Sequence, residues 1–468
     1  MKKLISLLLA TVLVLSLCAC GAAEQKESAG LQVGYGREKI MPDAPVPLDG
    51  YGNNHLRISE NTLDLLYATC VAFRDGEETV LMFSIDLMLP KEDLVSVARD
   101  RIFKETGIAK DKMMFCFSHT HSAPDVTIKD NSAIQQFKET YWKGVVKAAQ
   151  TALADLTPAK LMGTKVITEG MNFVRHYLMN DGTYYGSNFG SAASGYKDHA
   201  MEKDPEMLLV KVEREGEKKD ILLMNFGGHP TKTGGNAKYD ISADYVGSTR
   251  TAVERDSDML FAFYQGAGGN QNTTSLLPGE EYIADYIEFG ETMSKLILDS
   301  VPSMRLIEGS GIKTQQLMFE QPVCHDDEEL QAEAREVYDL WTSTGDRGVG
   351  NKRALELGLR SVYHAAGILA RPSRPQSDKM EINAITIGNM AFVTAPYEMF
   401  SVNCMAIKEN SPYDMTFVAT CSNENHWYTP SAEAYDYSCY ESNVCYFAKG
   451  AAEATSEKLV EMLNGLKG

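Results

Sequence analysis

The sequence predicts an α/β fold in which mixed β-sheets are flanked by helices. Continuous apolar runs rich in Val, Ile, Phe and Met recur along the chain, and such runs are typical of strands covered on both faces. They occupy residues 79–89, 113–119, 207–213, 221–227, 259–265, 382–388, 390–396 and 415–421. Helical patterns lie between many of them, at residues 91–107, 135–156, 242–256 and 282–301. In open α/β sheets, sites are built at the carboxyl ends of strands, so we expect functional residues there.

One region departs from this alternation. Over residues 326–370, two charged helical stretches flank the turn "STGDRGVGNK", and the Pro-rich loop "RPSRPQSDK" leads back to strands. This pattern predicts an inserted helical hairpin. The chain then ends in an amphipathic helix over residues 447–466. We therefore expect residues 31–468 to form a single domain with one helical insertion.

The N-terminus has the pattern of a bacterial lipoprotein signal. Two lysines, an apolar run and small residues precede a cysteine in "MKKLISLLLATVLVLSLCAC". We expect residues 1–19 to be cleaved, Cys20 to carry lipid, and residues 20–30 to form a tether. The protein would then be lipid-anchored at the extracytoplasmic face of a bacterial cell membrane. An uncleaved membrane helix is the alternative, but the run is short for a bilayer.

Charge and cysteine usage exclude some classes of function. The formal net charge of −19 disfavours nucleic acid and anionic membrane surfaces as partners. The seven cysteines beyond the signal are scattered, several within apolar runs, and there is no C-x-x-C motif. This favours buried thiols over a disulfide framework or a thiolate metal site.

A chain with only nine histidines places His119 and His121 one residue apart in "FCFSHTHSAP". In an extended segment alternate side chains point to the same side, so the pair would aim both imidazoles at one point. Two hydrogen-bonded histidines at a strand end would be the simpler interpretation, because two ligands do not make a metal site.

Three further strand ends carry residues that can bind a metal. His229 follows "ILLMNFGG", Glu398 follows "MAFVTAPY", and Tyr428 follows "MTFVATCSNENHW", with His426 close by. Each alone fits a capped or solvated residue, but together they favour one site. Two imidazoles and a carboxylate suit zinc, which lowers the pKa of a bound water to about 7. Such a bound hydroxide can attack a carbonyl, and a nearby tyrosine or arginine would stabilise the oxyanion.

Collinear motifs carry a family resemblance over roughly residues 31–460. The order "SHTHSAPD", "NFGGHPT", "QGAGGNQN", "APYE" and "WYTPSAEAYDYSCYE", with "VGYGREKIMP" and "DGYGN" before them, resembles the neutral, non-lysosomal ceramidase family. These proteins are zinc-dependent amidases that hydrolyse N-acyl sphingosines. The resemblance implies a catalytic domain of the same fold and chemistry.

The resemblance also implies roles for individual residues. The residues that match its zinc ligands are His119, His229, Glu398 and Tyr428. His121 matches a catalytic histidine beside the metal, and Tyr440, twelve residues after Tyr428, matches the oxyanion donor. Arg175 in "NFVRHY" resembles the substrate-contacting arginine, with His176 as the alternative at this position.

Two departures bear on mechanism and substrate. Where the family has a G-D-V-S-P-N hexapeptide with a serine proposed as nucleophile, this chain has "GGNQNT", which puts Asn272 at the serine position. Ser275 lies nearby, but a loop serine with a solvated hydroxyl is the simpler interpretation. The long family members continue into a C-terminal β-sandwich, and we expect no such further domain here.

We therefore predict a zinc hydrolase that cleaves the amide bond of an N-acylated, lipid-like substrate by attack of zinc-bound water. Ceramide heads the substrates by resemblance. A zinc esterase or amidase acting on a non-lipid compound is the alternative within enzymes, because the same hydroxide attacks either carbonyl. A lipid-anchored solute-binding protein is the alternative outside enzymes, and it predicts ligand binding without turnover.

Overall fold

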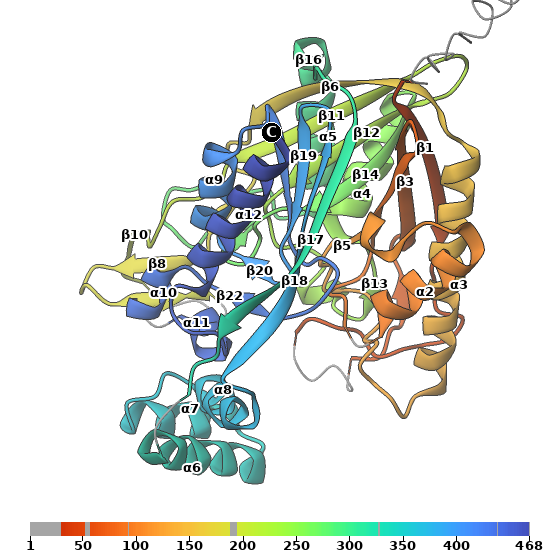
Figure 1. The fold of residues 1–468 in the computed structure, drawn as a ribbon. Coiled ribbons are helices and arrows are strands. Elements are labelled where there is room, and N and C mark those ends of the chain that lie inside the picture. Colours follow the sequence, from red (N-terminus) through yellow and green to blue (C-terminus); the bar gives the residue numbers. More distant parts are fainter. Residues whose placement is uncertain are drawn as a thin grey trace, which may run out of the picture.

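Two β-sheets pack face to face, with helices on the outside of both (Figure 1). The computed structural model describes residues 30–51, 57–91, 93–187, 194–325, 328–437 and 439–467. A buried apolar layer lies between the sheets, and residues of both sheets contribute to it, including Phe73, Met82 and Tyr264 from one and Phe392 and Phe417 from the other. The predicted α/β fold with mixed sheets flanked by helices is confirmed.

The larger sheet is mixed and has nine strands. Its main path runs β14-β12-β11-β6-β1-β3-β4-β5, and β16 pairs with β6. The pairs β12–β14 and β4–β5 are parallel, and the other neighbours are antiparallel. The strands are β1 (Gln32–Lys39), β3 (Tyr67–Asp75), β4 (Glu78–Ile85), β5 (Met113–Phe117), β6 (Thr157–Ile167), β11 (Glu206–Arg214), β12 (Asp220–Phe226), β14 (Met259–Gln265) and β16 (Arg305–Leu306).

The smaller sheet has four strands in the order β17-β18-β19-β21. They are β17 (Ile312–Pro322), β18 (Ser377–Ile387), β19 (Met390–Thr394) and β21 (Met415–Ala419). The pair β19–β21 is parallel. Each sheet therefore contains parallel strands whose carboxyl ends can carry a site.

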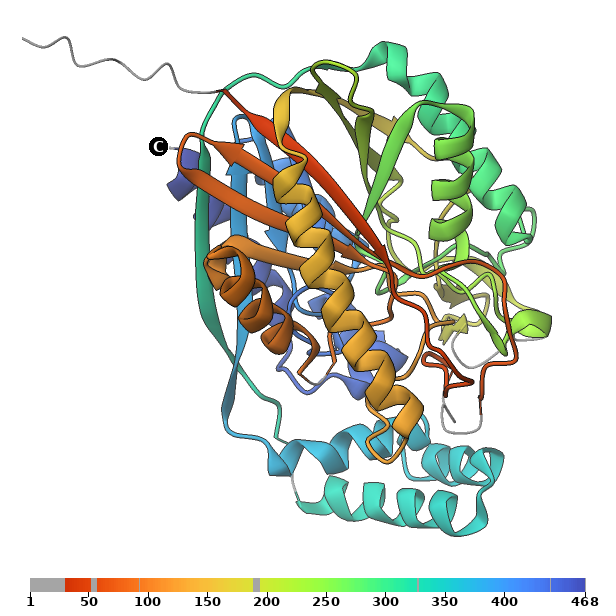
Figure 2. The same ribbon diagram turned by 90° about the vertical axis from the view of Figure 1, so that its right-hand side faces the viewer.

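Helices cover the outer faces of both sheets. They are α2 (Leu94–Thr106), α3 (Ser132–Ala154), α4 (Asp244–Asp256), α5 (Tyr286–Ser300), α9 (Ser401–Asn410) and α12 (Ala451–Lys467). Helices α2 and α3 pack on one half of the larger sheet, α4 and α5 on the other half, and α9 and α12 on the smaller sheet. Figure 2 shows α3 crossing the outer face of β1 and β3. This approach requires glycine at position 36 of β1, where a Cβ would lie 2.1 Å from the carbonyl oxygen of Ala148.

Short strand pairs and short helices surround the ends of the main strands. The strands are β2 (Asn61–Thr62) with β13 (Asp240–Ile241), β7 (Phe173–Val174) with β15 (Gln271–Asn272), β20 (Glu398–Met399) with β22 (Tyr428–Thr429), and the sheet of β8 (His176–Met179), β9 (Tyr184–Gly186) and β10 (Tyr196–His199). The short helices are α10 (Ala432–Tyr437), α11 (Tyr440–Val444), η2 (Lys110–Lys112), η4 (Gly235–Ala237), η5 (Val301–Ser303) and η6 (Arg371–Ser373).

The insertion contains three helices where the sequence analysis expected two. They are α6 (Glu328–Thr344), α7 (Arg347–Glu356) and α8 (Val362–Ala370), and they share a small apolar core at one end of the molecule (Figures 1 and 2). Helix α7 begins inside the segment predicted as a turn. Gly345 adopts a positive φ of 67° after α6, and the Asp346 side chain then accepts hydrogen bonds from the amides of Gly348 and Val349. This N-cap starts a new helix directly after the turn.

All the apolar runs predicted as strands form strands, and all the helical patterns between them form helices. Six of the seven described cysteines are buried, as the scattered thiols within apolar runs predicted. Within the described ranges, no helix has the length and apolar character needed to cross a bilayer. The predicted signal peptide and Cys20 lie outside the described residues.

Candidate metal centre

The predicted metal ligands come from the ends of strands in both sheets. His119 and His121 follow β5 of the larger sheet, and His229 follows β12 of the same sheet. Glu398 follows β19 of the smaller sheet, and Tyr428 follows β21. Glu398 and Tyr428 then face each other in the parallel pair β20–β22. The site thus lies where the carboxyl ends of the two sheets meet, as predicted for this fold class.

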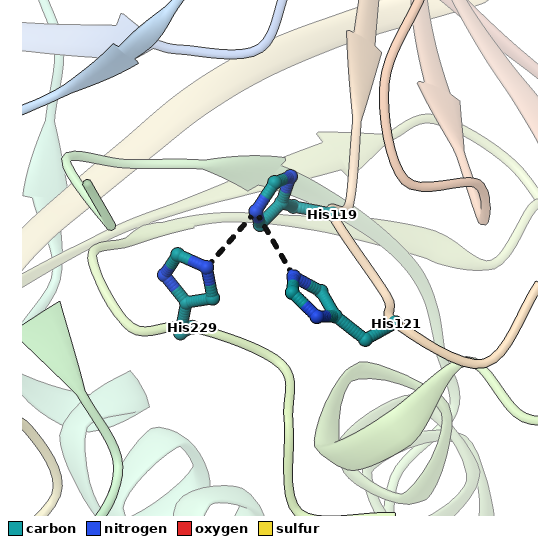
Figure 3. Close-up of side chains that lie close together, drawn as sticks. All are labelled: His119, His121 and His229. Carbon is teal, nitrogen blue, oxygen red and sulfur yellow. Dashed lines mark hydrogen bonds between the residues drawn. The ribbon is translucent and has the colours of Figure 1, made fainter. Parts of the chain in front are cut away.

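Figure 3 shows the imidazoles of His119, His121 and His229 turned towards one another at this junction. Two of them, His119 and His229, form a group of three with the carboxylate of Glu398. The Nε2 atom of His119 lies 3.1 Å from Nε2 of His229 and 3.1 Å from a carboxylate oxygen of Glu398. The same oxygen lies 3.5 Å from Nε2 of His229. All three residues are buried. Ligand atoms around tetrahedral zinc are separated by about 3.3 Å when metal–ligand bonds are near 2.05 Å, so these distances suit such an ion.

Backbone carbonyls fix the orientation of two imidazoles. Nδ1 of His119 lies 3.1 Å from the carbonyl oxygen of Met88, and Nδ1 of His229 lies 2.8 Å from that of Gly268. A carbonyl only accepts hydrogen bonds, so Nδ1 carries the proton in both rings. In the neutral ring the Nε2 lone pair then points to the centre, which is how metal-binding histidines are commonly held.

The centre lacks positive charge of its own. Neither carboxylate oxygen of Glu398 accepts a hydrogen bond from the described residues outside the imidazoles. A single proton on Nε2 of His119 could form a hydrogen bond with either His229 or Glu398 but not with both. A bound cation would interact favourably with all three side chains. Burial, together with nearby Arg175 and the other imidazoles, lowers the pKa of His229 well below its usual value, which keeps the ring neutral. These residues therefore fit a metal ion.

His121 approaches the same point in a different environment. Its Nε2 lies 3.3 Å from Nε2 of His119. Its Nδ1 is buried and has no hydrogen-bond partner among the described residues. Burial, followed by the charge of His119, lowers the pKa of His121 well below its usual value. Because His121 lacks the carbonyl support of the other two rings, the structure is consistent with the separate catalytic role predicted for it, which remains a prediction.

His119 and His121 converge as predicted, but the prediction that an extended segment brings them together was wrong. Strand β5 ends at Phe117, and His119 adopts a positive φ of 69° instead of an extended conformation. A turn, and not strand alternation, brings the two imidazoles together. Positive φ values recur at Cys421 and Trp427 in the loop after β21. Such strained conformations of non-glycine residues often occur at functional sites.

Arg175, Tyr428 and Tyr440 lie together beside the centre. The backbone amide of Arg175 donates a hydrogen bond to the carbonyl oxygen of Asn270. Its guanidinium donates to the hydroxyl oxygen of Tyr428 at 3.2 Å and to the carbonyl of Gly269 at 2.7 Å. The rings of Tyr428 and Tyr440 meet edge to face at 5.9 Å. Burial, and then the Glu398 carboxylate, raises the pKa of Tyr428 well above its usual value.

Glu441 orients this arginine, a role that no sequence pattern predicted. One carboxylate oxygen of Glu441 lies 2.5 Å from the guanidinium of Arg175, and the other lies 2.8 Å from Nε2 of His176. Although burial opposes its charge, Arg175 and His176 together lower the pKa of Glu441 to about 2. Nδ1 of His176 lies 3.1 Å from the hydroxyl of Tyr437. Arg175 therefore faces the centre, while its alternative His176 faces away from it.

His176, Cys439 and Glu441 form a second group of side chains that could bind a metal. Here the guanidinium of Arg175 already neutralises the carboxylate. Burial and the negative charge of Glu441 raise the pKa of the Cys439 thiol well above its usual value, which disfavours the thiolate that a metal requires. The ion pair between Arg175 and Glu441 therefore makes this group the weaker candidate for a metal.

The remaining residues considered in the sequence analysis lie at the margin. Asn272 pairs with His229 through the backbone and donates from its amide to the Ser187 hydroxyl at 3.3 Å. The Ser275 hydroxyl accepts a hydrogen bond from the amide of Leu277. His426 contacts Tyr446 and Glu424 and does not join the three imidazoles.

Comparison with known proteins gives structural matches only. No model of a protein family matches the sequence, and no curated protein matches it. The neutral ceramidase from Pseudomonas aeruginosa is similar in structure, with a TM-score of 0.69 and 16% sequence identity over 93% of this chain and 74% of that one. A ceramidase complexed with C2 gives a TM-score of 0.69 and 15% identity over 94% and 75%. The chain therefore has a neutral ceramidase-like fold.

Proposed function

We propose that this protein is a zinc-dependent hydrolase that cleaves the amide bond of N-acylated, lipid-like substrates. The observation that carries the proposal is the group of buried, mutually facing acceptor atoms of His119, His229 and Glu398, which only a cation can satisfy together. The two similar structures are ceramidases by name, so ceramide heads the candidate substrates. Tyr428 completes the proposed ligand set.

The proposed mechanism divides the work among residues around this centre. When bound, zinc would act as a Lewis acid on the substrate carbonyl and raise the acidity of a nearby water. His121, whose ring is neutral, would accept the proton of the attacking water as a general base and later return it to the amine. Arg175 and Tyr440 lie on the side of Tyr428, where they would stabilise the developing oxyanion.

Asn272 bears on whether an acyl-enzyme forms. A carboxamide cannot be acylated and released as a serine hydroxyl can, so we propose direct attack by water. Mass spectrometry of enzyme quenched during turnover tests this point. We expect unmodified protein, and an acyl adduct on Ser275 would contradict direct attack.

The N-terminal sequence also supports a proposal for the cellular location of the protein. We propose that lipid on Cys20 tethers the enzyme to the extracytoplasmic face of a bacterial membrane, which would place it beside lipid substrates. Fractionation of untreated cells and mass spectrometry of the mature N-terminus test this, and a globomycin-type inhibitor of signal cleavage should leave the signal peptide attached. A mature N-terminus other than a lipidated Cys20 would contradict it.

Metal removal and restoration test the function itself. The purified protein is treated with a chelator, reloaded with zinc, and assayed against short-chain ceramide, other N-acyl amides and matched esters. We expect amide hydrolysis that disappears with the metal and returns with zinc. Hydrolysis of esters alone would favour the zinc esterase, and zinc-loaded protein that binds these compounds without turnover would favour the solute-binding protein.

A further inference from the structure

A cavity of about 280 Å³ lies between the inserted helices and the body of the protein. Asn351 and Leu355 line it from α7, and Arg360 and Ser361 line it from the loop before α8. The opposite wall belongs to the sheet β8–β9 and to α10, and it is rich in aromatic residues: Tyr184, Tyr185 and Tyr437. Two separate parts of the chain therefore build this cavity.

The cavity adjoins the candidate active site on two sides. Tyr363, two residues after Ser361, meets the ring of Tyr440 edge to face at 5.6 Å. Gly186, which lines the cavity, is followed by Ser187, whose hydroxyl accepts the hydrogen bond from Asn272. A ligand in the cavity therefore lies beside the residues proposed to act on the substrate carbonyl.

The walls combine flat aromatic surface with one available cation. The rings of Tyr184 and Tyr437 stack at 4.6 Å, and the exposed side chain of Leu355 lies opposite. His176 also lines the cavity, but Glu441 already pairs with it. Among the described residues, no carboxylate forms an ion pair with the guanidinium of Arg360. A guanidinium binds a carboxylate through two parallel hydrogen bonds, so this cavity suits an anionic group.

We propose that this cavity binds the amine side of the substrate and selects N-acylated amines that carry a carboxylate, with Arg360 as the recognising cation. The inference rests on the proposed amidase function. The volume lies just below the range of about 300–1,000 Å³ for ligand pockets, which suits a group of amino-acid size better than a long-chain base. Within the proposed substrate class, the cavity therefore favours such amides over ceramide. The acyl chain would extend away from the insertion.

Two amides that differ only in charge test the proposal: N-dodecanoylglycine and the neutral N-dodecanoylethanolamine. We expect the zinc-loaded wild type to prefer the glycine amide. Arg360→Ala should lower kcat/KM for it by about ten- to a hundredfold, mostly through KM, and leave the neutral amide within about twofold. Arg360→Lys should restore part of the preference. Arg335→Ala, an identical change at an exposed position on α6 away from the cavity, is the matched control and should change neither amide.

Equal wild-type rates for the two amides, or an equal effect of Arg360→Ala on both, would overturn the cavity assignment and leave the amidase proposal intact. If neither amide is hydrolysed, the assay with ceramide and other N-acyl amides decides the amidase proposal, and calorimetry decides the cavity assignment separately. In that case N-dodecanoylglycine should bind wild type at least about tenfold more tightly than it binds Arg360→Ala. Equal affinities would overturn the assignment.

Discussion

Two buried polar clusters lie side by side in this protein, and they differ in charge balance. In each, three ligand atoms lie within 4.8 Å of one another: those of His119, His121 and His229 in the first cluster, and those of His176, Cys439 and Glu441 in the second. Glu398 joins the first cluster through His119 and His229. The second cluster contains the guanidinium of Arg175, which pairs with Glu441. The first contains no such cation, and its carboxylate faces imidazole nitrogens that carry lone pairs. Missing positive charge, more than proximity, therefore makes the first cluster the stronger candidate for a metal centre.

Removing a ligand from each cluster gives the largest expected contrast. His119→Ala should lose the single zinc and all hydrolysis, and so should His229→Ala, which involves no positive φ. Cys439→Ser should keep the zinc and the hydrolytic activity, because we expect the metal in the first cluster and not in the second. Metal analysis of the purified variants by mass spectrometry is the measurement, with exposed His325→Ala as a control. Metal loss in Cys439→Ser would mean that we have assigned the metal to the wrong cluster.

His121→Ala separates metal binding from catalysis within the first cluster. We expect most of the zinc to remain and the rate to fall by roughly a hundred- to ten-thousandfold, the usual contribution of a general base. Parallel measurements of metal content and kcat check this. If the variant loses its metal, His121 is a ligand and the roles within the histidine pair are reversed.

Tyr440→Phe tests the side of the centre that faces the inserted helices. Loss of an oxyanion donor should raise the activation barrier by about 2.7–4 kcal/mol, a rate loss of roughly a hundred- to a thousandfold with the metal retained. Near-normal turnover accompanied by a lower Tm would instead identify Tyr440 as a packing residue.

Glu441→Gln should have the smallest effect on rate, because it acts through Arg175. We expect a loss of about ten- to a hundredfold in kcat, with zinc retained. The folded-state pKa of about 2 lies below the usual value of 4.5, so this carboxylate stabilises the fold above pH 4.5 and stops doing so as the pH falls towards 2.

The stability contribution of Glu441 at neutral pH is on the order of 3 kcal/mol from this pKa difference. Urea unfolding at pH 7 and pH 3 checks it: wild type and Glu441→Gln should differ clearly at pH 7 and less at pH 3. Stability differences that are equal at both pH values would show that the ion pair with Arg175 is not the cause.

Much of the architecture could be predicted from the sequence because its strands are covered on both faces. That environment requires uninterrupted apolar runs such as residues 221–227, and these are visible without a structure. Placing His119, His229 and Glu398 near one another followed from the rule that sites form at the carboxyl ends of strands. Their assignment as metal ligands came from residue type and family resemblance, and it remains to be tested.

Other features depend on contacts that residue identity does not encode. The carbonyls of Met88 and Gly268 orient two imidazoles, and any residue type could supply them. Glu441 follows Tyr440 in a polar segment, where an acidic residue normally indicates a solvated helix face. Its partners, Arg175 and His176, are distant in sequence. The turn at His119 was missed because β5 shows no breaker residue before the histidine pair.

The junction of the two sheets has a consequence for the order of assembly. His119 and His229 follow strands of the larger sheet, whereas Glu398 follows a strand of the smaller one, whose strands come late in the chain. A nascent or partly folded chain therefore holds no complete ligand set, and metal would be captured only after the sheets have docked. Bound metal would then resist separation of the sheets, so metal occupancy should report correct folding of the whole chain and slow its unfolding.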